Sequence, residues 1–301
     1  MADSYGPSDG SENSPAPLTP ATPVHPLRRF AILLAYDGAM FRGWQLQNSL
    51  REAELPSTQG ALEAALSGFT GHPVRVMASG RTDAGVHALG QVVHADLHTP
   101  HSADILARAL AIRLPVGLSI RRMAEVPLEF DARRAAIRRT YTYRLVLGPP
   151  ASGVLVRQRA GIFAGQHDIH AMAQAAALLP GHHDFAGFRN SDCNAKRTDL
   201  TLETSHLAPL SDDSRLALSI PPEADALIYT IACRSFLMHM VRRIVGSLVL
   251  VGRGKLSLDE IRQTLLTGTT PARTLLAPAA GLVLHRVDYP EDPFHLPNSQ
   301  P

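Results

Sequence analysis

The segment of residues 236–252, FLMHMVRRIVGSLVLVG, carries two arginines inside an otherwise almost entirely apolar run. Its apolar residues recur at helical spacing and extend nearly all the way round, which is typical of a buried helix. One face of this expected helix contains Leu237, Val241, Ile244, Val245 and Leu248. The rest of the chain must supply a core that encloses it, and 301 residues, 45% of them apolar, are enough to do so.

The two arginines of that helix, Arg242 and Arg243, need an explanation, because arginine is rarely fully buried without a partner. Either both side chains lie on a solvated edge, or another segment brings an acid to one of them. Arg242 shares a side of the helix with Gly246, where the missing side chain leaves room for a second backbone. We expect a turn that carries a carboxylate to pack there.

A candidate for that turn lies in ASGRTDAGVHALGQVVH, residues 78–94. Asp83 is its one acid, Arg81 is two residues away, and strand-like runs flank it. Asp-Ala-Gly turns are common for conformational reasons alone, because aspartate tolerates turn geometry. However, loops held by a rigid scaffold are also where catalytic groups concentrate. Asp83 is therefore the candidate catalytic carboxylate.

Tyr141 is a candidate aromatic contact for a nucleic-acid base. It follows the basic segment FDARRAAIRRTY and shares a predicted strand face with Tyr143, Leu145 and Leu147. Such an aromatic is usually part of a core. A basic segment that leads into an aromatic also matches the combination of phosphate contacts and stacking in nucleic-acid sites.

A row of histidines offers a different kind of site. His94, Asp96 and His98 alternate along one strand, with His101 nearby, and could be imagined around a divalent metal. No HExxH motif is present, and a solvated strand face explains the alternation equally well. We expect no metal there.

The pattern of the whole chain predicts an α+β protein, with two similar halves around a shared cleft. Residues 1–27 and 291–301 are expected to be disordered tails, because the first is rich in Pro and Ser and both lie outside the periodic segments. The N-terminal half, 28–150, would carry Asp83 and Tyr141, and the C-terminal half, 151–290, the arginine helix. A helix is expected near 57–71, with Ser57 or Thr58 as its candidate N-cap and its end near Gly71. Further helices are expected near 102–113, 167–179, 236–252 and 257–266, and strands near 29–36, 74–79, 91–98, 117–125, 140–147, 199–207, 214–220 and 226–233.

Charge and cysteine content narrow the class of protein. The two predicted tails hold five of the 27 acidic residues and none of the 29 basic ones, so residues 28–290 carry 22 acids against 29 bases, a net charge of +7. All but two of those bases are arginine, which favours a nucleic-acid partner, although a GC-rich genome produces the same bias. The two cysteines are far apart, which fits a reducing, cytoplasmic compartment, and no apolar run reaches membrane-spanning length.

Six segments together resemble the tRNA pseudouridine synthase A family, in the family's order and spacing. The GRTDAGVHA run is the most specific of them, and together they span about residues 29–290. They are YDGAMFRGWQLQ, STQGALEAAL, GRTDAGVHALGQVVH, HDFAGFR, FLMHMVRRIVGSLVLVGRG and APAAGLVLHRVDY.

This resemblance implies a pseudouridine synthase fold with a mostly antiparallel sheet around a central catalytic cleft. It implies a homodimeric enzyme, without cofactor or metal, that converts uridine to pseudouridine at positions 38 to 40 of the anticodon stem-loop of tRNA. Asp83 would be the nucleophile, Arg242 its partner, and Tyr141 the aromatic against the target base and a possible general acid or base. Leu282 would contact the uracil, and Arg81 would help to hold the base out of the stack.

Three positions depart from the family's usual pattern: Asp131, Arg134 and Thr140 stand where His, Phe and Arg are common. These departures bear on local RNA contacts.

The implied chemistry is redox-neutral, since a glycosidic bond breaks, the base turns and a carbon–carbon bond forms. An ionised carboxylate, kept oriented by an arginine, could attack ribose C1′, attack uracil C6, or withdraw a proton from the sugar. The target base must leave its stack, which calls for an aromatic face to receive it. Two alternatives are a non-catalytic tRNA-binding protein of the same fold and a metal-dependent hydrolase that uses His94, Asp96 and His98.

Overall fold

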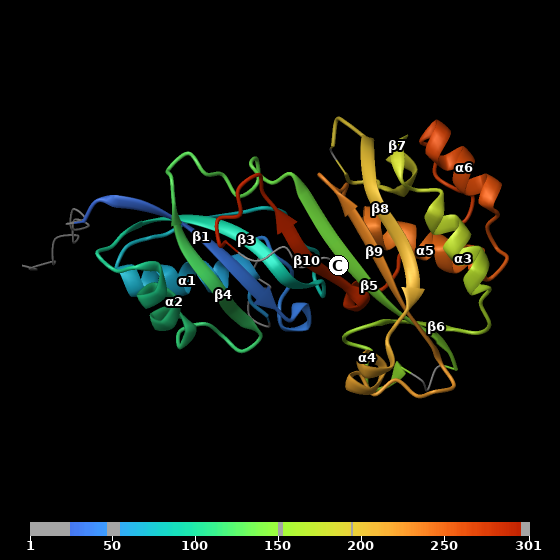
Figure 1. Ribbon diagram of the computed structural model, residues 1–301, viewed down its shortest axis with the longest axis horizontal. Helices are drawn as coiled ribbons and strands as arrows, with labels where there is room; N and C mark the ends of the chain where they lie inside the picture. Colours follow the sequence, from blue (N-terminus) through green and yellow to red (C-terminus); the bar gives the residue numbers. More distant parts are fainter. Residues whose placement is uncertain (1–24, 47–54, 150–152, 194, 296–301) are drawn as a thin grey trace, which may run out of the picture.

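A single ten-stranded sheet runs through the molecule (Figure 1), in a computed structural model that describes residues 25–46, 55–149, 153–193 and 195–295. The strand order is β4-β1-β3-β10-β5-β9-β8-β7, with β2 paired to β3 and β6 paired to β5. The strands are β1 (Leu27–Tyr36), β2 (Val76–Ala78), β3 (His87–His98), β4 (Leu118–Val126), β5 (Arg138–Gly148), β6 (Gly161–Ala164), β7 (Gly181–Asp184), β8 (Asp199–Pro209), β9 (Asp225–Cys233) and β10 (Leu282–Asp288).

The pairings are antiparallel except for β10 with β3 and β5 with β6, which are parallel. The predicted α+β class with a mostly antiparallel sheet is therefore confirmed.

Strand β10 joins the two predicted halves. Although it comes from the end of the chain, it lies between β3 and β5 in the middle of the sheet (Figure 1). Leu282 is in register with Tyr143, and Leu284 with Tyr141. On its other side, Val283 of β10 is paired with His87 of β3. Only β10 therefore separates β5, which carries Tyr141, from β3, which follows the Asp83 turn.

Helices cover the sheet at both ends (Figure 1). The helices α1 and α2 lie with the N-terminal strands, whereas α3, α5 and α6 lie with the C-terminal strands. Their bounds are α1 (Thr58–Thr70), α2 (Ala103–Ala111), α3 (Ile169–Ala177), α4 (Asp212–Ala217), α5 (Met240–Gly252) and α6 (Leu258–Thr267). Three short 3-10 turns are η1 (Gly38–Met40), η4 (Ala186–Phe188) and η5 (Ala279–Gly281).

The local end signals explain where several of these helices begin and end. Ser57, the expected cap of α1, accepts a hydrogen bond from the Gly60 N–H, and Gly71 ends that helix in the left-handed region. The first turn of α6 has a capping box formed by Ser257 and Glu260.

Helix α5 is the buried helix that the sequence predicts. Eleven of its thirteen residues are buried, and the two that remain partly accessible are Arg242 and Arg243. It begins at Met240, four residues after the expected start, because His239 has a left-handed backbone conformation that helical residues do not adopt. Leu237 and Met238 therefore belong to the approach to the helix.

One predicted strand is wrong. Residues 214–220 fall in and after helix α4, where Ser211 caps the first turn and accepts a hydrogen bond from the Ser214 N–H. Two aspartates in that turn and Arg215 in the last turn suit the helix dipole. Residues 214–220 lie between β8 and β9 in the sequence, but these two strands are hydrogen-bonded to each other in the sheet, so no strand is inserted between them. Strands β6, β7 and β10 are additional to the prediction.

Parts of the two predicted tails lie inside the described residues. Within the N-terminal prediction, 1–27, β1 already begins at Leu27, and residues 1–24 lie outside the described residues. Within the C-terminal prediction, 291–301, residues 291–295 are described, and Phe294 is buried in the main core cluster. In the described part of the chain, no helix combines the length and apolarity needed to cross a membrane.

Candidate active site

The Asp83 turn connects the loop after β2 to strand β3. The Val86 N–H donates to the Asp83 carbonyl at 3.1 Å, and Gly85 between them has φ +79°, a conformation that favours glycine. The segment YDGAMFRGW, residues 36–44, packs against the backbone of this turn. A Cβ on Gly38 would overlap the Val86 backbone, so this close approach requires glycine.

Residue Thr82 fixes the turn to the core. Its carbonyl accepts a hydrogen bond from the Trp44 N–H at 3.0 Å, and its hydroxyl lies 2.8 Å from the buried Tyr36 hydroxyl. The side chain of Asp83 follows immediately and is 32% exposed. A rigid base therefore presents an accessible carboxylate.

Arg242 reaches that carboxylate from helix α5. Its Nη1 lies 3.2 Å from Asp83 Oδ2, and its side chain is only 13% exposed. Its Nε donates to the Ala277 carbonyl at 2.8 Å, and the Ala277 N–H donates back to the Arg242 carbonyl at 3.2 Å. The segment before β10 thus holds the arginine in position, and charge-assisted bonding orients the carboxylate.

The backbone beside Gly246 belongs to this same segment. A Cβ on Gly246 would overlap the Leu275 carbonyl oxygen. The expectation that the Asp83 turn fills this space is therefore wrong: the glycine admits the chain at Leu275, and Arg242 extends past it to reach Asp83.

Tyr141 is buried on β5, and its ring meets the edge of the Phe236 ring at 5.2 Å between centroids and 88° between planes. Burial raises its pKa well above the usual value for tyrosine, so the hydroxyl stays protonated at neutral pH. Among the described residues the hydroxyl has no hydrogen-bond partner. The ring therefore offers an apolar, neutral surface.

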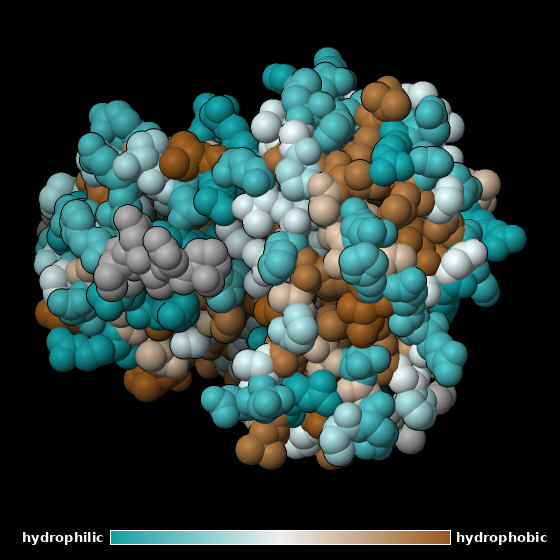
Figure 2. Space-filling model, turned by 45° about the vertical axis from the view of Figure 1, so that its right-hand side comes forward, coloured by the Kyte–Doolittle hydropathy of each residue, from teal (hydrophilic) through white to brown (hydrophobic). Residues whose placement is uncertain are grey.

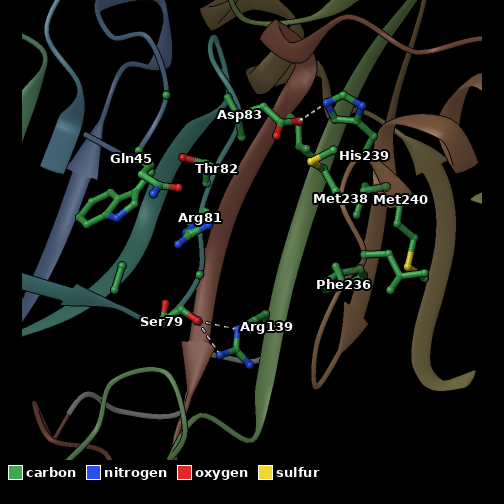
Figure 3. A pocket seen from close by; sticks show the side chains of 18 of the residues that line it. Gln45, Ser79, Arg81, Thr82, Asp83, Arg139, Phe236, Met238, His239 and Met240 are labelled. Atoms are coloured by element: carbon green, nitrogen blue, oxygen red, sulfur yellow. Dashed lines mark hydrogen bonds and ion pairs between the residues drawn. The ribbon is translucent and has the colours of Figure 1, made fainter. Parts of the chain in front are cut away.

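Leu282 and Arg81 lie on the same cavity with different exposures. Leu282 is buried at the start of β10, whereas Arg81 is exposed. Figure 3 shows Arg81 on the same segment as Asp83, with its side chain turned away from the carboxylate. Within the described part of the chain, no hydrogen bond or ion pair holds the Arg81 guanidinium.

These side chains line one cavity of about 1000 Å³. That volume is at the upper end of the range for small-ligand pockets. Two aspartates, Asp83 and Asp192, face it, against five arginines, which makes the wall basic. These arginines are Arg42, Arg81, Arg133, Arg139 and Arg242.

Arg139 is a structural member of the site that sequence reasoning treated only as part of a basic segment. It is buried and donates to three main-chain carbonyls, those of Ser79 (2.6 Å), Arg133 (3.0 Å) and Arg234. Figure 3 shows the contact with Ser79. Burial lowers the pKa of Arg139 from the ordinary value of arginine. It ties β5 to the loop that leads to Asp83.

His239 is a second residue that sequence reasoning missed. Its Nε2 lies 3.3 Å from Asp83 Oδ2, and Figure 3 shows the ring facing the carboxylate. His239 lies within the motif FLMHMVRR, but helical spacing alone does not indicate that its side chain would contact Asp83.

The histidine row on β3 is occupied by other contacts. His94 Nδ1 accepts the Ala132 N–H at 3.0 Å, Asp96 binds Arg29 through both oxygens at 2.6 and 2.7 Å, and His98 Nδ1 lies 2.8 Å from the His25 carbonyl. Over the described ranges, no cluster of three His, Cys, Asp or Glu side chains could hold a metal ion.

The three positions that depart from the family pattern differ in their surroundings. Asp131 Oδ1 accepts the N–H groups of Arg133 and Arg134 at 2.8 and 2.9 Å, which closes the turn before β5. Arg134 is exposed, and Thr140 is buried in β5 opposite Ala232 and Arg286.

Comparisons with known proteins find similar sequences over most of the chain. A family model described as tRNA pseudouridine synthase matches residues 33–133 and 175–290. A "tRNA pseudouridine synthase A" of Methylorubrum extorquens (strain PA1) is 40% identical over 263 residues, which cover 87% of this chain and 99% of the relative. A protein of the same name from Afipia carboxidovorans is 40% identical, over 87% of this chain and 99% of the relative. Another, from Chloroflexus aurantiacus, is 38% identical, over 88% of this chain and 90% of the relative.

Proposed function

Since the chain belongs to the tRNA pseudouridine synthase family, we propose that it isomerises uridine to pseudouridine at positions 38 to 40, in the anticodon arm of tRNA. The observation that carries the proposal is the pairing of Asp83 with Arg242 in a basic cavity beside the Tyr141 ring. The restriction to the anticodon arm rests on the family resemblance.

The reaction breaks the bond between uracil N1 and ribose C1′ and forms one between C5 and C1′. The C5 proton leaves and N1 gains a proton, so no electrons are exchanged with a cofactor. In our proposal Asp83 is the nucleophile that opens the nucleotide, and Arg242 keeps the carboxylate ionised and oriented. The protein must also hold the base while it turns.

Tyr141 and Leu282 are suited to that holding role. Both are buried at the cavity, and they lie on adjacent strands, β5 and β10. A flat ring and an apolar side chain can contact a uracil without fixing the direction of its polar edges. We assign Tyr141 to stacking on the target base and Leu282 to apolar contact with it.

The arginines of the cavity wall are suited to the RNA backbone. Arg81 and Arg133 are exposed and face the cavity, where a flipped nucleotide would bring its phosphates. We assign Arg81 to holding the base out of its stack, because it lies in the turn segment only two residues before Asp83 and has a free guanidinium among the described residues.

We further propose that the enzyme is a cytoplasmic homodimer. Both cysteines are free, as expected in a reducing compartment. Val154, Leu155 and Leu216 are 63%, 80% and 81% exposed, on segments that pack around one minor core cluster. Figure 2 shows extended apolar surface over the C-terminal half, which supports an interface there.

The test is incubation with unmodified tRNA transcripts, followed by mapping of pseudouridine at nucleotide resolution. We expect product only in the anticodon arm, and light scattering should give twice the mass of 32.4 kDa. Product at another position would refute the proposed target. Binding of tRNA without product would favour the non-catalytic alternative.

A further inference from the structure

His239 shares an oxygen of Asp83 with Arg242. Its Nε2 lies 3.3 Å from Oδ2, and Arg242 Nη1 lies 3.2 Å from the same atom. His239 stands at the start of helix α5 and Arg242 three residues later, so one helix end supplies both contacts. Among the described residues, Asp83 Oδ1 has no hydrogen-bond partner.

The backbone of His239 is held in a costly conformation. It has φ +63° and ψ +1°, in the left-handed region, where a side chain with a Cβ is disfavoured and glycine is not. Only Ser219 and His295 share a positive φ among the described non-glycine residues. Backbone strain of this kind is concentrated at functional sites, and of the three strained residues His239 is the one whose side chain lies against Asp83, which points to a use for its imidazole.

The surroundings of the ring indicate which nitrogen carries the proton. His239 Nδ1 is buried and has no hydrogen-bond partner among the described residues. A proton on Nδ1 would be a buried donor without an acceptor, which is unfavourable. A neutral ring with its proton on Nε2 avoids this cost and makes Nε2 a donor to the carboxylate.

We propose that His239 is a positioning residue that donates its Nε2–H to Asp83 Oδ2. This inference rests on the proposed function, with Asp83 as the reacting group. Two donors on the same oxygen restrain rotation of the carboxylate about its Cβ–Cγ bond more strongly than one donor would. With both donors on Oδ2, the plane of the carboxylate is fixed, and Oδ1 is the oxygen presented to the nucleotide.

Two variants separate this role from a purely structural one. His239→Gly removes the donor but suits the positive φ, so its melting temperature should equal or exceed that of the wild type. Its single-turnover rate at saturating tRNA should fall about 10- to 100-fold, the effect expected for a lost charge-assisted hydrogen bond, with unchanged affinity for tRNA. His239→Gln keeps an amide donor and the backbone strain, so it should be less stable than the Gly variant and yet faster.

Ser219→Gly is the matched control, because Ser219 has φ +54° on an exposed turn outside the cavity. It should gain stability without a change in rate. Wild-type turnover by His239→Gly would overturn the proposal. So would equal losses of rate in the Gly and Gln variants.

A second measurement does not depend on activity. Nitrogen-detected NMR of the histidine rings, with His239 assigned by its loss in His239→Gln, should show the proton on Nε2. A proton on Nδ1 would overturn the positioning role even in an active enzyme. If the wild type makes no pseudouridine while the ring has the expected tautomer, the proposed function fails and the contact to Asp83 stands.

Discussion

Arg242 Nη1 lies 3.2 Å from Asp83 Oδ2, although 159 residues separate the two in the chain. The pair joins the turn before β3 to the buried helix α5, and the segment before β10 braces the arginine from the other side. The site therefore forms only when both halves of the sheet are assembled.

A double-mutant cycle should show that this pair is coupled. Asp83→Asn with Arg242→Met should cost about 1–2 kcal/mol less in free energy of unfolding than the sum of the single changes, because each single change leaves the other charge without its partner. Urea denaturation measures the four proteins. Arg243→Met is the control, since no contact joins Arg243 to Asp83 among the described residues, and its combination with Asp83→Asn should be additive within about 0.5 kcal/mol. Additivity in both cycles would mean that Arg242 and Asp83 do not interact.

Gly246→Ala should destabilise the protein and reduce turnover together. The added methyl group would overlap the Leu275 carbonyl, which must shift along with the Ala277 contact to Arg242. We expect a loss of roughly 1–3 kcal/mol in unfolding free energy. Gly68→Ala provides the comparison, because Gly68 lies in helix α1 with open space around it and should gain about 0.5–1 kcal/mol without a change in activity. A neutral Gly246→Ala would contradict the close packing of this segment.

Tyr141→Leu should slow pseudouridine formation more than Tyr141→Phe. Stacking of a base on an aromatic ring is worth about 1–3 kcal/mol, and phenylalanine keeps the ring while losing a hydroxyl that has no protein partner among the described residues. Single-turnover rates of the two variants measure the difference. A Phe variant as slow as the Leu variant would instead assign the function to the hydroxyl.

The five described tyrosines should remain protonated in the folded protein near pH 10. Burial raises the pKa of Tyr36 to about 12 and those of Tyr141, Tyr143, Tyr229 and Tyr289 further. The unfolded chain releases these protons near pH 10, whereas the folded state keeps them, so stability should fall as pH rises above that value. Ultraviolet difference titration should detect at most one of the six tyrosines near pH 10 in native protein, and all six in denaturant. Ionisation of several phenols near pH 10 in the native state would refute this burial.

The sequence predicts the elements whose information is local. The all-round apolar character of α5, the Ser57 cap and the Gly71 end of α1 are confirmed, since each depends on residues within a few positions. The sequence wrongly predicts a strand at residues 214–220, because a short segment of alternating residues fits a strand and a surface helix equally well. The family resemblance, which is confirmed, does not depend on deciding between helix and strand for any short segment, because it rests on whole sequence motifs.

The relationships that build the site are mostly not local, and periodicity does not reveal them. The insertion of β10 between β3 and β5 depends on strands nearly 200 residues apart. Arg139 binds carbonyls of three separate segments, and the left-handed backbone of His239 interrupts a pattern that reads as continuous helix. Arginines in an apolar helix do indicate a distant acid, which is why Arg242 and Asp83 could be nominated as partners.

The most direct test of the central role of Asp83 compares Asp83→Asn with Asp192→Asn, since both carboxylates line the same cavity. Each variant is incubated in excess over unmodified tRNA, with affinity and pseudouridine measured on the same samples. We predict that Asp83→Asn binds tRNA nearly as well as the wild type and forms product at least about 10³-fold more slowly, whereas Asp192→Asn remains active. Turnover by Asp83→Asn within about tenfold of the wild type would contradict its assignment as the nucleophile.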